Sequence, residues 1–144
     1  MADALLESFS FEEIGQHIPH KGEAIWLDRA WSGNMTANGE KFFPFDSKVF
    51  NGHFDDNPIV PGIYLIEGMA QTACFCKIPG ISNKRSEILM IKNVKFRTPV
   101  KTNTIVKYEV VVKSVTSVIE FACKAYDENK TFATMEFIGM ITKE

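Results

Sequence analysis

The chain has 144 residues, of which 45% are hydrophobic and 24% are charged, and its formal net charge is −2 at pH 7. We expect one domain over residues 1–144, because the length fits a single hydrophobic core and the composition excludes an intrinsically disordered chain. We expect no nucleic-acid partner, since nucleic-acid-binding domains usually carry a clear basic excess.

The sequence also argues against a secreted, metal-binding or membrane-spanning protein. Three cysteines are too few for a disulfide framework, and no cysteine or histidine grouping has the spacing of a zinc site, so no metal is expected. The first seven residues lack the basic start and apolar stretch of a signal peptide. The most apolar segment, residues 59–76, contains Pro61 and Glu67, so we expect no membrane span and a cytoplasmic protein.

A short helix is the first expected element. Ser10 followed by Glu13 forms a capping box, which predicts a helix over residues 11–17. Pro19 ends this helix, because proline cannot continue it.

Two strands and a loop are expected next. Residues 24–31 have the composition of a strand, and the Gly33-Asn34 and Asn38-Gly39 pairs predict turns before a second strand over residues 41–45. Residues 46–58 are then expected to form a loop.

A long central helix is predicted after this loop. Pro61 suits the first helical position, where its missing N–H would be unpaired anyway, and helix-compatible residues continue to about Lys77, before Pro79-Gly80. Residues 63–76 are apolar on nearly every side of this helix, which predicts burial on all faces.

The C-terminal half predicts antiparallel strands. Four strand-like runs follow a loop at residues 82–86, and they cover residues 88–97, 104–113, 118–126 and 131–141. Residues 106–113 alternate between apolar and charged side chains, the pattern of a strand with one wet face, and residues 127–130 predict a hairpin. A buried helix inserted after the second strand of a long antiparallel sheet is an α+β arrangement, in the order of a hot-dog fold.

Glu67 is the strongest candidate for chemistry, since it is the one acid in the helix expected to be most buried. A buried carboxylate is costly unless it is paired or neutralised, and such a group suits a general acid. Gln71 lies one helical turn further on, so its amide can hydrogen-bond Glu67 and fix its direction. The alternative is an ordinary acid on the helix surface.

Histidine is the usual base near neutral pH, and the chain has three. His53 lies in a turn-rich loop just before the helix that carries Glu67, and catalytic groups concentrate in loops held by rigid elements. His17 and His20 are interpreted as structural, although His20 could line a site entrance.

The start of the central helix is a candidate oxyanion hole. The first N–H groups of a helix are unpaired and its dipole favours negative charge there. Gly62 would let a ligand oxygen approach closely, so a substrate carbonyl bound there would be polarised.

Six segments resemble one enzyme family in order and spacing. They are Phe50-Asn51-Gly52-His53-Phe54, residues 57–62 (NPIVPG) and residues 65–71 (LIEGMAQ), flanked by residues 18–20, 27–29 and 94–100. The chain closely resembles the β-hydroxyacyl-acyl-carrier-protein dehydratases of the FabZ type over most of its length, with the resemblance weakening after about Thr102.

The resemblance implies His53 as base, Glu67 as acid and the Gly62 amide as oxyanion hole. The implied reaction converts a (3R)-3-hydroxyacyl group on acyl carrier protein to the trans-2-enoyl product, with no cofactor beyond the phosphopantetheine of the carrier. Relatives that also isomerise the product have Asp at the acid position, so Glu67 favours simple dehydration. A homodimer is implied, with the histidine and acid of one site from different subunits; some members form trimers of dimers.

The chain departs from the family pattern in two places. Asp55-Asp56 stands where the family usually has Pro-Gly, and residues 21–24 (KGEA) replace an arginine followed by bulky residues. These changes affect the expected substrate and site entrance. They fit a member of a specialised pathway, such as aryl polyene or polyketide assembly, whereas the FabZ type in general serves fatty-acid synthesis.

Two further sets of residues are assigned to substrate and carrier. Tyr64, Met69 and Phe75 are candidates to line an apolar tunnel beside the central helix. Lys95 and Arg97 share one face of a predicted strand, which makes them a candidate docking patch for an acidic carrier protein. An ordinary solvated strand face is the alternative.

Two rival functions stay open. A hot-dog thioesterase would hydrolyse the same class of thioester with a carboxylate and a water. A catalytically silent subunit would stabilise or guide an active dehydratase partner. The spacing of His53 and Glu67 argues against the first, and the joint presence of His53, Gly62, Glu67 and Gln71 argues against the second.

Overall fold

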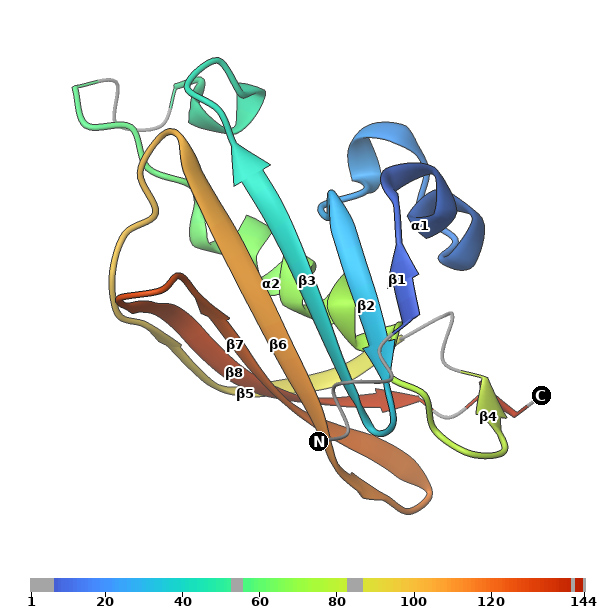
Figure 1. The fold of residues 1–144 in the computed structure, drawn as a ribbon. Coiled ribbons are helices and arrows are strands. Elements are labelled where there is room, and N and C mark those ends of the chain that lie inside the picture. The colour runs from blue at the N-terminus through green and yellow to red at the C-terminus, as the bar shows by residue number, and fades with distance from the viewer. Residues whose placement is uncertain (1–6, 53–55, 83–86, 141, 144) are drawn as a thin grey trace.

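A computed structural model describes residues 7–52, 56–82, 87–140 and 142–143 of the chain. A seven-stranded antiparallel sheet, in the order β1-β2-β3-β6-β7-β8-β5, wraps around helix α2 (Figure 1). The strands are β1 Glu7–Phe9, β2 Arg29–Gly33, β3 Thr36–Phe43, β5 Ile88–Phe96, β6 Thr104–Val115, β7 Val118–Tyr126 and β8 Thr131–Met140, with β4 Ile81–Ser82 and β9 Thr142–Lys143 paired separately. The helices are α1 Phe11–His17, η2 Gly22–Ala24, η3 Lys48–Phe50 and α2 Gly62–Ala73.

The predicted α+β hot-dog arrangement is confirmed, and its core lies between α2 and the sheet. Alternate residues of β6, including Val106 and Val110, are fully buried, and α2 contacts β3, β6 and β7. The capping box of α1 is also confirmed: the Glu13 N–H donates to Ser10 Oγ, and the Ser10 N–H donates to Glu13 Oε1. Among the described helices, none is long and apolar enough to cross a membrane.

The three cysteines, Cys74, Cys76 and Cys123, are buried thiols. Burial raises the pKa of the Cys76 and Cys123 thiols, because the charged thiolate would lose its hydration. These thiols therefore behave as small apolar groups of the core.

Helix α2 is shorter and more exposed than predicted. It ends at Ala73 rather than near Lys77, because the Lys77 backbone pairs with the turn between β2 and β3: its N–H donates to the Gly33 carbonyl, and its carbonyl accepts from Met35. Burial on all faces holds for residues 68–76, but Ile63 in the first turn is 67% exposed. The prediction of complete burial is therefore wrong for the first turn of the single chain.

The turn predicted at Asn38-Gly39 is also wrong, since both residues lie within β3. A Cβ atom at Gly39 would be 2.6 Å from Thr72 Oγ1 on α2, so this glycine allows the helix to approach the strand closely. Glycine therefore occurs at position 39 because the helix packs closely on the sheet there, and not because the chain turns. The hairpin predicted at residues 127–130 is confirmed by the bond from the Asp127 N–H to the Lys130 carbonyl.

Tyr108 on β6 provides a test of this packing. Its side chain is fully buried, and its hydroxyl lies against Gly68 of α2 without a hydrogen-bond partner among the described residues. Burial raises the pKa of Tyr108, so the hydroxyl stays neutral. A buried hydroxyl without a partner is unfavourable, so Tyr108→Phe should raise the free energy of unfolding by about 1 kcal/mol.

Denaturant unfolding at a fixed protein concentration would measure this change, with Tyr126→Phe as a control at a half-buried tyrosine. The control should change stability little. A loss of stability in Tyr108→Phe alone would show that the hydroxyl contributes a favourable interaction.

Candidate active site

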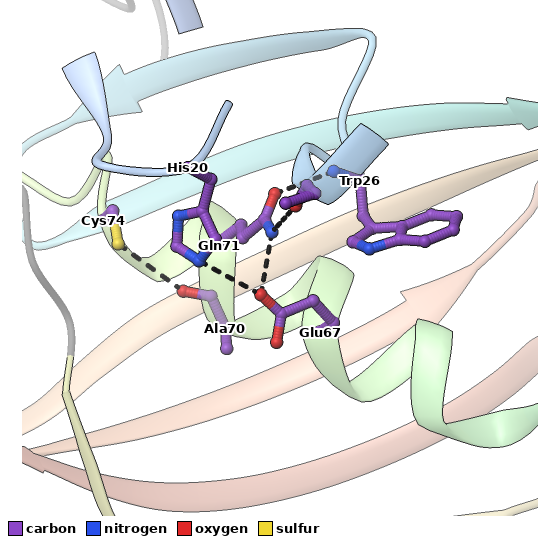
Figure 2. Close-up of polar contacts among 7 residues, drawn as sticks. His20, Trp26, Glu67, Ala70, Gln71 and Cys74 are labelled. Atoms are coloured by element: carbon purple, nitrogen blue, oxygen red, sulfur yellow. Dashed lines mark hydrogen bonds and ion pairs between the residues drawn. The ribbon is translucent and has the colours of Figure 1, made fainter. Parts of the chain in front are cut away.

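A buried amide, Gln71, organises the polar side chains on α2 (Figure 2). The Gln71 side chain is 1% exposed, and both of its N–H groups and its oxygen form hydrogen bonds. Its Nε2 donates to Glu67 Oε2 and to the Ala24 carbonyl, both at 2.8 Å, and its Oε1 accepts from the Trp26 N–H at 2.8 Å. The hydrogen bond predicted between Gln71 and Glu67 is therefore present.

The same contacts explain why the strand predicted over residues 24–31 begins only at Arg29 and overlaps the prediction at residues 29–31. Residues 22–24 form η2, and strand β2 begins only at Arg29. The Ala24 carbonyl and the Trp26 N–H pair with the Gln71 side chain instead of a neighbouring strand. This irregular segment is thereby attached to α2 beside Glu67.

His20 completes the cluster, and the sequence did not predict this contact. Its Nε2 lies 3.3 Å from Glu67 Oε2, while its Nδ1 is buried and has no hydrogen-bond partner among the described residues. Figure 2 shows both His20 and Gln71 directed at the same carboxylate oxygen. The other oxygen of Glu67, Oε1, forms no hydrogen bond in the described part of the chain.

A small pocket of about 210 Å³ surrounds this cluster. Its lining residues are His20, Glu67, Ala70, Gln71, Cys74 and Ile88. The Glu67 side chain is 38% exposed, so the expectation of a deeply buried acid is not met in the single chain. The carboxyl group is instead accessible to a ligand from this pocket.

Gly62 is the first residue of α2, after Pro61 as N-cap. Its N–H forms no hydrogen bond with any described residue, as expected for the start of a helix. A Cβ atom at Gly62 would lie 2.6 Å from the Phe96 ring of β5, so packing as well as ligand approach favours glycine here.

The other predicted site residues either lie outside the described residues or lie away from the pocket at Glu67. His53 and Asp55 lie outside the described residues. Met69 and Phe75 are fully buried in the core, and the half-buried Tyr64 packs on Trp26 with ring centroids 4.4 Å apart. None of the three tunnel candidates lines the pocket at Glu67.

Lys95 and Arg97 lie together, as the strand pattern predicted. Both line a hollow of about 560 Å³ on the sheet, with Glu136 of β8 beside them. The alternate residue Phe96 contacts Gly62, which places the basic pair on the opposite face of the strand from α2.

The arrangement of one helix within a wrapped antiparallel sheet defines a hot-dog protein, and comparisons identify its family. Residues 31–136 match the family model described as ApeI-like, the ApeI dehydratase. The chain belongs to this family of dehydratases, which are hydro-lyases, enzymes that eliminate water from a substrate.

Curated relatives match nearly the whole chain. The 3-hydroxyacyl-[acyl-carrier-protein] dehydratase FabZ of Ehrlichia chaffeensis is 31% identical over 92% of this chain and 94% of its own length. The enzyme of the same name from Helicobacter pylori strain Shi470 is 32% identical over 96% of this chain and 94% of its own length.

Solved structures share the fold. The dehydratase heterocomplex ApeI:P from Xenorhabdus doucetiae matches with a TM-score of 0.70 and 12% identity over 91% of each chain. A sigma28-regulated virulence protein from Campylobacter jejuni matches with a TM-score of 0.68 and 13% identity over 94% of this chain and 93% of its own. At these identities the likeness shows the fold alone.

Proposed function

We propose that the chain removes water from a (3R)-3-hydroxyacyl group held as a thioester on acyl carrier protein, giving the trans-2-enoyl thioester. The observation that carries the proposal is the Glu67 carboxyl group, which faces a pocket. Its Oε2 accepts from Gln71, and its Oε1 forms no hydrogen bond with a described residue. The names of the FabZ relatives supply the substrate class. The fatty-acid, polyketide and aryl polyene pathways all use such a step.

The proposed reaction divides the elements of water between two side chains. The thioester carbonyl accepts a hydrogen bond from the Gly62 N–H, which acidifies the proton on C2. His53 takes this proton as the C2–C3 double bond forms, and Glu67 protonates the departing 3-hydroxyl group. No metal or redox cofactor takes part in this scheme, because the thioester itself accepts the electron pair.

A second copy of the chain is proposed to complete the site. Strand β5 is an edge of the sheet and exposes large apolar side chains, namely Ile88, Leu89, Met90, Ile91 and Phe96. Exposed apolar edge strands favour association with another strand, and a symmetric homodimer would pair β5 with its copy. Ile88 also lines the pocket at Glu67, so a partner at this edge would lie beside the acid.

Activity of the purified chain alone tests the proposal against the silent-subunit alternative. One of the similar solved structures is a dehydratase heterocomplex, which is the kind of assembly that this alternative requires. The chain is incubated with a 3-hydroxyacyl pantetheine thioester, and formation of the conjugated enoyl thioester is followed by its ultraviolet absorbance. Turnover by a pure homo-oligomer supports the proposal. Absence of turnover that a second dehydratase subunit restores would support the silent-subunit function.

Carrier docking on Lys95 and Arg97 gives a separate prediction. Both side chains are exposed and neither forms an ion pair with a described residue, so they are available to an acidic partner. Lys95→Glu with Arg97→Glu should raise KM for a carrier-protein substrate by about tenfold or more, since like charges would then oppose each other. Turnover of a small pantetheine thioester should stay unchanged.

Steady-state kinetics with both substrates measures this effect. Lys77→Glu with Lys107→Glu makes the same change in net charge at two positions outside this hollow, and it should leave both KM values near those of the wild type. An equal rise of KM in the two double variants would show that total charge, and not a local patch, attracts the carrier.

A further inference from the structure

The hydrogen bonds around Gln71 determine which Glu67 oxygen can carry a proton. The Trp26 N–H is a donor and the Ala24 carbonyl is an acceptor, so the Gln71 side chain can take only one orientation. The amide nitrogen of Gln71 therefore faces Glu67 and donates to Oε2 at 2.8 Å. Oε2 is an acceptor in this contact, and the acidic proton is favoured on the other oxygen, Oε1.

The contacts of Glu67 Oε2 also indicate which nitrogen of His20 carries a hydrogen. With the acidic proton favoured on Oε1, Oε2 is left as an acceptor, so the contact with His20 Nε2 at 3.3 Å favours a hydrogen on that nitrogen. The second nitrogen, Nδ1, is buried and has no partner among the described residues, so a proton there would leave a buried donor unsatisfied. The tautomer with its hydrogen on Nε2 is the one that best fits both observations.

We infer that His20 is a positioning residue of the dehydration reaction: with Gln71 it holds Glu67 Oε2 as an acceptor, so that the proton donated to the substrate resides on Oε1. This inference rests on the proposed function and adds a residue to it. His20 contributes no proton of its own.

The contribution of His20 appears when Glu67 gives up its proton. The C3–O bond breaks, the leaving hydroxyl takes the proton from Oε1, and water departs while the C2 proton remains on His53. Glu67 is then a carboxylate, and the negative charge on Oε2 is stabilised by the two donors already in place. Return of a proton from His53 to Glu67 through solvent restores the starting state.

The experiment compares three variants at one position. His20→Ala removes the donor and should lower kcat about ten- to a hundredfold with little change in KM, the range for a hydrogen bond to a charged group. The amide nitrogen of glutamine reaches about as far along the side chain as His20 Nε2, whereas that of asparagine reaches only as far as Nδ1. His20→Gln should therefore restore most of kcat, and its matched control His20→Asn should not.

A double-variant cycle with Glu67→Gln provides the second readout. If His20 acts through the Glu67 carboxyl group, His20→Ala should cause no further loss in the Glu67→Gln background. Wild-type kcat in His20→Ala, equal rescue by Asn and Gln, or the same fold loss in both backgrounds would each overturn the inference. Failure of the wild-type protein to dehydrate any 3-hydroxyacyl thioester would instead refute the proposed function.

Discussion

Glu67→Gln and His53→Ala should each lower kcat for 3-hydroxyacyl thioester dehydration by about 10²–10⁴-fold, the usual contribution of a positioned acid or base. Glutamine keeps the size of Glu67 and can still accept from Gln71, but it has no acidic proton. Alanine at position 53 leaves no group to accept the C2 proton. Both rates are measured at saturating substrate, so that weaker substrate binding does not account for the loss.

Stability measurements on the same proteins separate catalysis from folding. Glu67 is 38% exposed, so Glu67→Gln should leave thermal unfolding nearly unchanged. Glu109→Gln makes the same chemical change at an acid on β6, half-buried beside Lys124, and should keep wild-type kcat. Near-normal turnover in Glu67→Gln or His53→Ala would remove that residue from the mechanism.

Mixing the two inactive proteins should restore activity if each site contains His53 from one subunit and Glu67 from the other. Random pairing makes roughly half of the dimers mixed, and each mixed dimer has one intact site of two, so roughly a quarter of wild-type activity should return. The mixture is refolded together to ensure exchange, and mixed dimers are confirmed by mass spectrometry under native conditions.

The control for this experiment mixes Glu67→Gln with wild-type protein, which should give activity proportional to the wild-type sites that remain. Exchange without any recovery in the first mixture would show that the base and the acid of a site come from one chain. It would also remove the functional reason for the proposed pairing at β5.

The sequence predicted correctly those helices and strands whose boundaries depend on residues close together in the chain. The capping box of α1 involves residues three apart, and the strand β7 was predicted with both ends correct because its alternation and its flanking turns are continuous. The three-residue β1 and the paired β4 and β9 were missed, since such short strands carry almost no periodic signal.

The errors occurred where a distant residue decides the backbone. Residues 24–26 have strand composition, but Gln71, 45 and 47 positions further on, takes their hydrogen bonds. The end of α2 depends on backbone pairing between Lys77 and the turn between β2 and β3. No window of local sequence contains either partner, so tertiary contacts overrode propensity in both places.

In the candidate site too, the contact between neighbours in sequence was predicted and the contact between distant residues was not. Glu67 and Gln71 are four residues apart on one helix, so their contact follows from helical geometry. His20 is 47 residues from Glu67 and was interpreted as structural, with the lining of a site entrance as the alternative. A further signal was that Ile18-Pro19-His20 belongs to the segments shared with the FabZ type. Its contact with Glu67 required the folded chain.

The most direct test of the central claim is the fate of the acyl group on the carrier. The purified chain is incubated with 3-hydroxyacyl groups of several lengths loaded on acyl carrier protein, and the intact carrier is analysed by mass spectrometry. We expect loss of one water molecule while the acyl group stays attached to the phosphopantetheine. Release of the free carrier with a 3-hydroxy acid would contradict this account and identify a thioesterase.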